Sequence, residues 1–176
     1  MKFNLDEAVE LLSRTPTLLK AMLKDLSHNW VDKNEGPETW SPYDVVGHLI
    51  HGERTDWITR LKIILNYGES HTFEPFDRFA QFEASKGRSL EELLEQFTAL
   101  REQNITTLRE FKITGNDLGR TGKHPELGVV TLGELLATWV VHDLDHIGQI
   151  VRTMAKQYET EVGPWKAYIS ILRKRN

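Results

Sequence analysis

Apolar residues recur at helical spacing over most of the chain, and stretches of strand-like alternation are few. Four long segments carry this pattern, and we expect helices over about 5–26, 42–67, 90–111 and 132–158, with a short helix near 165–173 at the end. Helices with one apolar face must bury that face against a partner. The pattern therefore predicts an all-α protein, built as a four-helix bundle with an extra short C-terminal helix.

The residues that precede the four long segments are of the types that begin helices. A side-chain oxygen at the N-cap accepts a hydrogen bond from a free backbone N–H of the first turn. In a capping box, a glutamate three residues later returns the bond. The N-cap residues that we expect are Asn4, Ser41, Ser89 and Thr131. Pro16 interrupts the first segment, which is therefore either kinked there or restarted from Thr15.

The segments 29–39, 68–87 and 114–130 contain the glycine and proline residues that are typical of loops. Four phenylalanines recur every three residues in the second of these loops. We expect ordinary core packing for them, with a pocket lining or a dimer surface as the alternatives. They are Phe73, Phe76, Phe79 and Phe82.

The length and charge of the chain limit its partners. The 176 residues fit one domain with a sizeable core, and we treat 1–176 as a single domain. Lys and Arg number 22 against 26 Asp and Glu, and the one basic cluster, at 173–175, suits a solvated terminus. Because phosphate binding uses a clustered basic face, no nucleic-acid partner is expected.

Cysteine is absent, which excludes disulfides, thiolate metal ligands and a cysteine nucleophile. The apolar runs fall far short of the roughly 20 residues that a bilayer-spanning helix needs. The first residues also lack the apolar region of a secretory signal. We therefore expect a cytoplasmic protein with no membrane partner, in which histidine carries the chemistry.

Three histidines form a candidate metal site. His142 and His146 are four residues apart on the last long helix, a spacing that lets two imidazoles face one ion. His48 is the best candidate for a third ligand, because it lies beside the apolar face of its helix among small neighbours. His51 lies away from that face, so we expect a surface residue with only a weak claim as a fourth ligand. Histidines buried for packing alone would show the same pattern, so both interpretations remain open here.

Two acidic residues fall in the middle of apolar helix faces. Asp143 does so on the last helix and Glu53 on the second. Buried carboxylates are costly unless they are paired or hydrogen-bonded. Either could orient a histidine ligand or accept a proton at the site. The alternative is a structural role, in which each accepts from Trp139, a helix terminus or an arginine.

Two stretches resemble the signatures of the DinB/YfiT-like superfamily. The first is WSPYDVVGHL at 40–49, and the second runs from GVVTLGELL at 128–136 into HDLDHIGQI at 142–150. The resemblance covers most of the chain except 68–88. It implies an up-down-down-up four-helix bundle, usually dimeric. It also implies that His48, His142 and His146 hold a divalent metal ion, zinc or nickel.

The site and the resemblance together suggest a metal-dependent enzyme. Three neutral imidazoles leave a coordination position open, which is the catalytic rather than the structural pattern. Some relatives use low-molecular-weight thiols as co-substrates, so we expect transfer of a small thiol to an electrophile. Hydrolysis by metal-bound hydroxide is the second choice. The competing hypothesis is a non-catalytic stress-response or scaffold protein, in which the metal clamps the bundle.

Overall fold

A computed structural model describes residues 2–173, so Lys174 and Arg175 of the basic cluster lie outside the described residues. Two strands form a small hairpin beside the helices. In chain order the elements are α1 (Leu5–Leu23), α2 (His28–Val31), α3 (Pro42–Thr55), α4 (Trp57–Tyr67), α5 (Ala80–Ser85), α6 (Leu90–Glu110), β1 (Thr121–His124), β2 (Gly128–Thr131) and α7 (Leu132–Lys156).

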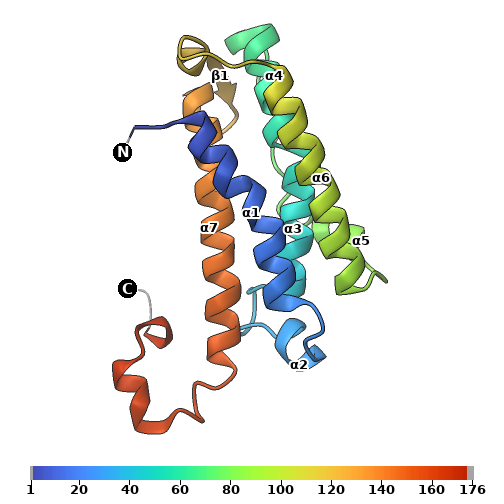
Figure 1. Ribbon diagram of the computed structural model, residues 1–176, viewed down its shortest axis with the longest axis vertical. Coiled ribbons are helices and arrows are strands. Elements are labelled where there is room, and N and C mark those ends of the chain that lie inside the picture. Colours follow the sequence, from blue (N-terminus) through green and yellow to red (C-terminus); the bar gives the residue numbers. More distant parts are fainter. Residues whose placement is uncertain (1, 174–176) are drawn as a thin grey trace.

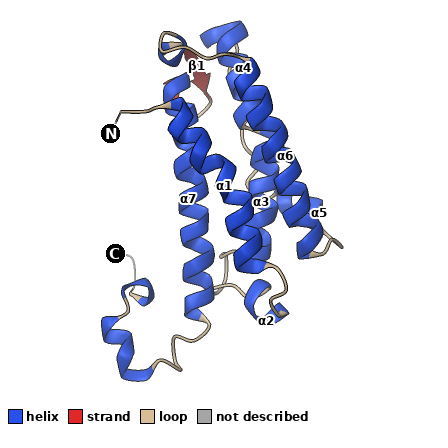
Figure 2. Ribbon diagram, in the orientation of Figure 1, coloured by secondary structure: helices blue, strands red, loops and turns tan. Residues whose placement is uncertain are grey.

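The long helices form the expected four-helix bundle. In Figure 1, α1 and α7 run in one direction and lie next to each other, while α3–α4 and α6 run in the opposite direction. This is the up-down-down-up order, and Figure 2 shows how small the strand content is. The predicted fold class is therefore confirmed. No helix in the described range 2–173 is long and apolar enough to cross a bilayer.

The four predicted helix starts are confirmed by their caps. Each N-cap side chain accepts a hydrogen bond from a backbone N–H three residues later. The caps of α3, α6 and α7 are complete capping boxes, in which the acidic residue bonds back to the cap. The ends were less accurate, since α1 and α7 stop at Leu23 and Lys156, a few residues early.

The second predicted helix is interrupted at one residue. Asp56 has φ −108° and ψ −76° and separates α3 from α4. The hydrogen-bond ladder continues on both sides, because the Asp56 N–H bonds to Gly52 and the Arg60 N–H bonds to Asp56. The apolar spacing also runs across the break, and no proline marks it. The sequence pattern therefore predicted one helix where there are two.

The segment predicted as the loop 114–130 contains the hairpin. β1 and β2 pair antiparallel, with Gly122 opposite Val130. Gly122 is packed so closely that a Cβ there would lie 2.7 Å from Ile64 and 2.9 Å from the Phe73 ring. The hairpin is therefore held against α4. The C-terminal segment differs too, because short 3₁₀ turns at Gly163–Tyr168 and Ser170–Leu172 replace the predicted helix.

The expected core role holds for only one of the four phenylalanines. Phe73 is buried, with 2% of its surface exposed. Phe76 is half-buried against His48. Phe79 and Phe82 are 62% and 43% exposed and stack on each other.

A buried polar layer separates two apolar clusters in the bundle. Along α1, α3–α4, α6 and α7, residues of one cluster come before the layer and residues of the other come after it. We define the layer by Arg101 and the two carboxylates that it binds. Arg101 donates to Asp143 at 2.6 and 3.0 Å and to Glu53 at 2.8 Å. All three residues are at most 3% exposed.

Arg101 also explains how α1 tolerates a proline. Pro16 lies inside α1 and has no N–H to donate to the Leu12 carbonyl four residues earlier. The Arg101 guanidinium donates to that carbonyl instead, at 2.9 Å. One side chain of α6 therefore contacts α1, α3 and α7 at the same level. Helix α1 is continuous through Pro16 and does not restart at Thr15.

Candidate metal centre

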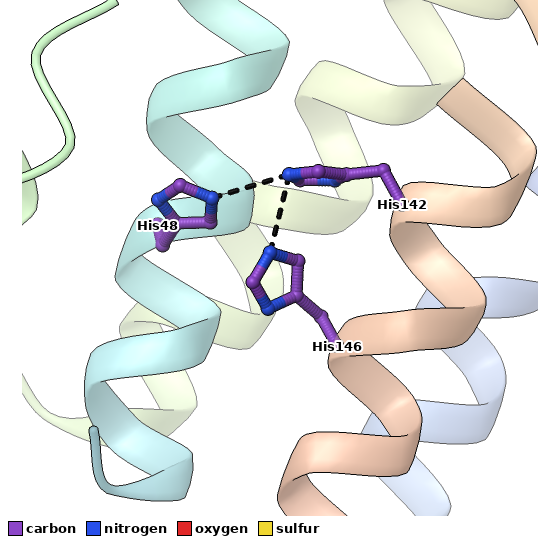
Figure 3. A group of neighbouring side chains, drawn as sticks. All are labelled: His48, His142 and His146. Atoms are coloured by element: carbon purple, nitrogen blue, oxygen red, sulfur yellow. Dashed lines mark hydrogen bonds between the residues drawn. The ribbon is translucent and has the colours of Figure 1, made fainter. Parts of the chain in front are cut away.

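The imidazole rings of His48, His142 and His146 converge between α3 and α7. Figure 3 shows His48 reaching from one helix and the other two from the facing helix. The Nε2 atom of His142 lies 3.2 Å from that of His48 and 3.1 Å from that of His146. One ligand atom of each histidine lies within 4.8 Å of the others. The structure thus brings together all three residues that the sequence singled out.

Helix geometry accounts for this convergence. His142 and His146 are one turn apart on an unbroken stretch of α7, so both rings extend from the same face. His48 lies two turns after the Ser41 cap, which fixes where α3 begins. Since α3 packs directly against α7, the His48 ring meets the other two across the interface.

The surroundings keep the three imidazoles neutral. Burial, followed by the nearby histidines, lowers the pKa of His48 to about 3 and that of His142 to about 2. Burial also lowers the pKa of His146, opposed by its hydrogen bond with Gln149. A metal ion binds the lone pair of a neutral imidazole. The site therefore presents its histidines in the form that binds metal.

The nitrogen geometry fits a metal ion. Two nitrogens bound at about 2.0–2.1 Å to a tetrahedral ion lie about 3.4 Å apart, close to the separations of 3.2 and 3.1 Å that His142 makes with His48 and His146. Gln149 Oε1 lies 2.9 Å from Nδ1 of His146, so Nδ1–H donates to it and Nε2 is left free for the ion. Within residues 2–173, the buried Nδ1 atoms of His48 and His142 have no hydrogen-bond partner. The donor set is that of a tri-histidine centre with an open position.

Glu53 and Asp143 make the contacts that were expected for a structural role. Glu53 accepts from Trp139 Nε1 at 2.9 Å as well as from Arg101, and Asp143 is held by Arg101 through both oxygens. Among the described residues, neither carboxylate hydrogen-bonds a histidine of the triad. The contacts assign both to the buried polar layer, and they do not support the roles suggested for them in orienting a ligand or accepting a proton.

His51 does not join the triad. Its ring packs on Phe76, with the centroids 4.8 Å apart, and it is half-buried rather than fully on the surface. None of its nitrogens belongs to the converging group in the described part of the chain. Its proposed place as a fourth ligand has no support in this geometry.

A cavity of about 470 Å³ adjoins the three histidines. The helices α3–α4 and α7 form its long walls, and the hairpin and the segment after α4 complete it. Its apolar lining includes Trp40, Trp57, Phe73 and Phe76. A larger hollow of about 590 Å³ lies between α1 and α6, but no histidine lines it. The cavity beside the triad is therefore the candidate binding site.

Three residues of this cavity, Trp40, Asp56 and Arg60, were missed at the sequence level. The Trp40 ring covers the triad, 4.7 Å from the ring of His48 and 6.1 Å from that of His146. Asp56 and Arg60 form an ion pair further along the cavity wall. Their four-residue spacing was a visible signal for the pair, whereas the contact of Trp40 depends on the folded path of the chain.

Comparison with known proteins agrees with the fold. Residues 11–150 match the model of the DinB superfamily, and the chain belongs to that family. It is 26% identical over 147 residues to a protein of Oceanobacillus iheyensis named "Putative metal-dependent hydrolase OB0782", with 83% of each chain covered.

A solved structure shows the same fold. It is YfiT from Bacillus subtilis, described as "a probable metal-dependent hydrolase with an unusual four-helix bundle topology". The TM-score is 0.73 at 24% identity, over 90% of this chain and 87% of that one. The relatives thus carry names that refer to metal-dependent chemistry, and the histidine triad could bind a divalent ion.

Proposed function

We propose that this protein is a metal-dependent enzyme in which His48, His142 and His146 hold a divalent ion, zinc or nickel. The observation that carries the proposal is the convergence of three neutral imidazoles at the wall of a cavity. A structural site is usually closed by four protein ligands, whereas three leave a position for a reactant. The names of the two relatives support an enzyme of this type.

The reaction that we favour is transfer of a small thiol to an electrophile. A bound divalent ion would lower the pKa of a thiol or a water molecule beside it, so that a nucleophile exists near neutral pH. A cysteine-type thiol has a pKa of about 8.5 and needs less assistance than water. Glu53 and Asp143, the two carboxylates that the sequence suggested as proton acceptors, are both held by Arg101, which favours the nucleophile that demands less of a protein base.

Hydrolysis is the second candidate, because the relatives are named as hydrolases. In either reaction, the chain's own residues do the same work. The histidines would hold the ion and orient the reactants, the Trp40 ring packs beside them, and the apolar cavity walls exclude water from the reacting groups. The expected partner is therefore a small molecule that enters the cavity.

We also propose that two copies associate through the face formed by α1 and α7. Four large apolar side chains on this face are 42–62% exposed, and three of them, Leu11, Leu18 and Leu144, line an apolar hollow between the two helices. The fourth is Val141. Light scattering of the protein and of Val141→Lys should give a dimer and a monomer; a monomer in both would contradict the association.

Metal uptake is the first test of the enzyme proposal. His48→Ala, His142→Ala and His146→Ala should each abolish stoichiometric zinc or nickel uptake in elemental analysis, because two imidazoles hold the ion too weakly. His51→Ala is the matched control, since it removes a neighbouring histidine and should leave uptake intact. Full uptake by His142→Ala would overturn the site.

Activity is the second test. Zinc- and nickel-loaded protein would be screened with small thiols against electrophiles, and with ester and amide substrates. Metal-dependent thiolate formation supports transfer, and metal-dependent hydrolysis without a thiol supports the second candidate. A large gain in melting temperature on metal binding, with no reaction and no change in thiol pKa, would identify the scaffold alternative instead.

A further inference from the structure

The cavity beside the triad has a second polar end. His48, Gly52, Asp56 and Arg60 follow one another at four-residue intervals along α3–α4, and all four line the cavity. At a rise of about 1.5 Å per residue, Asp56 lies about 12 Å from His48 along the helix. Aromatic and aliphatic side chains line much of the cavity, alongside Thr138 and Glu134.

Arg60 is held at this second end in a way that leaves its donors available. The side chain reaches back one turn, and its Nε atom pairs with Asp56. Its guanidinium also lies over the Phe73 ring, 5.3 Å from the centroid. Within residues 2–173, no acceptor hydrogen-bonds its two terminal nitrogens, although Arg60 is only 8% exposed. The planar fork is therefore held in place with its terminal nitrogens free to bind.

His124 supplies another donor at the same end. Its Nδ1 accepts hydrogen bonds from the backbone N–H groups of Glu126 and Leu127, at 3.1 and 3.2 Å. The neutral ring therefore carries its proton on Nε2. The ring packs edge-on against Phe73, the same residue that supports Arg60, and it lines the cavity. Burial, followed by the charge of Arg60, lowers the pKa of His124.

We infer that Arg60 and His124 bind a carboxylate at the far end of a long, largely apolar substrate whose reactive group lies at the histidine triad. A guanidinium fork matches the two oxygens of a carboxylate. Asp56 already balances part of the Arg60 charge, so a singly charged carboxylate suits the site better than a doubly charged phosphate. This inference deepens the proposed function and rests on it.

Mercaptoalkanoic acids test the inference, because the thiol binds the metal and the carboxylate reports the distance. Binding of mercaptopropionic, mercaptohexanoic, mercaptooctanoic and mercaptoundecanoic acids to zinc-loaded protein would be measured by calorimetry, each against the mercaptoalkanol of equal length. A chain that spans the distance should bind about tenfold more tightly as the acid than as the alcohol. Mercaptopropionic acid is too short and should show no such preference.

Variants of two arginines separate this contact from general charge. Arg60→Met should abolish the preference for the longer acids, and Arg60→Lys, which keeps the charge but loses the fork, should weaken it. Arg78→Met is the matched control, because Arg78 lines the same cavity but lies at the triad end, where its charge acts on His48. It should leave the preference intact. Circular dichroism melting shows whether each variant is folded.

The outcomes distinguish the inference from the proposed function. Metal-dependent thiol binding without a preference for any acid, or with a preference that survives in both Arg60 variants, overturns the carboxylate site and leaves the metal centre standing. Thiol binding that does not depend on metal overturns the proposed function. In that case, octanoate binding to metal-free protein decides the carboxylate site: loss of binding in Arg60→Met supports it, and unchanged binding overturns it.

Discussion

Replacement of Arg101 by methionine should destabilise the bundle severely. Arg101 is 1% exposed and makes hydrogen bonds to Glu53, Asp143 and the Leu12 carbonyl. Removal of one partner from a buried ion pair costs about 3–5 kcal/mol. The unsatisfied Leu12 carbonyl adds about 1–3 kcal/mol. The sum, about 4–8 kcal/mol, is comparable with the whole free energy of unfolding of a typical domain.

Urea denaturation, followed by tryptophan fluorescence, measures this cost. Trp139 lies in contact with Arg101 and Glu53, so its emission reports on the buried polar layer. The triple variant Arg101→Met, Glu53→Gln, Asp143→Asn should recover much of the loss, because no unbalanced charge remains buried. A cost below about 1.5 kcal/mol for Arg101→Met alone would show that the hydrogen bonds of Arg101 do not hold the helices together as proposed.

Pro16 offers an independent check on the same layer. Pro16→Ala restores an N–H that can donate to the Leu12 carbonyl. In the Arg101→Met protein, this change should recover about 1 kcal/mol. In the wild type, Pro16→Ala should raise the free energy of unfolding by less, because Arg101 already donates to the Leu12 carbonyl. Equal effects in the two backgrounds would mean that Arg101 and Pro16 are not coupled.

Three further predictions concern pH, the hairpin and α7. The pKa values of His48 and His142 are 6.5 in the unfolded chain and about 3 and about 2 in the folded protein. The unfolded state therefore takes up protons first as the pH falls below about 6.5. Metal-free protein should lose about 1.4 kcal/mol of stability per pH unit for each histidine. Gly122→Ala should destabilise the protein by about 1–3 kcal/mol, because the new methyl group overlaps Ile64 and Phe73. Gly148→Ala should stabilise it by about 0.5–1 kcal/mol, since Gly148 lies inside α7 with open space around its Cα.

Thermal and chemical denaturation checks all three. The slope of stability against pH should be shallower in His142→Ala, which has one buried imidazole fewer to protonate; an unchanged slope would assign the acid transition to other groups. Gly119→Ala is the control for the hairpin, because nothing lies within 4 Å of a Cβ there. If Gly119→Ala and Gly122→Ala cost the same, close packing is not the cause.

The features that the sequence predicted are those set by local interactions. Ser41 and Thr131 begin their helices because a cap and its partner are three residues apart, a relation visible in the sequence. His142 and His146 lie on one face of α7 because they are four residues apart, which is also visible in the sequence. His48 required an additional assumption, that two amphipathic helices pack face to face.

The features that were missed depend on contacts between distant residues. The buried positions of Glu53 and Asp143 indicated that a counter-charge was needed. Arg101 is at least 42 residues away from both carboxylates along the chain, and nothing in the sequence distinguished it from the other arginines. The hairpin was missed because each strand has only four residues and is stabilised by packing on α4. The proposed carboxylate site combines a local contact, between Asp56 and Arg60, with a distant one, between Phe73 and His124.

The hairpin allows the cavity lining to vary without moving the start of α7. β2 ends at Thr131, which is also the cap of α7, so residues added at the hairpin tip around 125–127 would not change where α7 begins. The exposed tip residue Leu127 nevertheless lines the cavity. Exposed loop tips accept insertions readily. Selectivity could therefore diversify by changes in tip length while the spacing of His142 and His146 stayed constant.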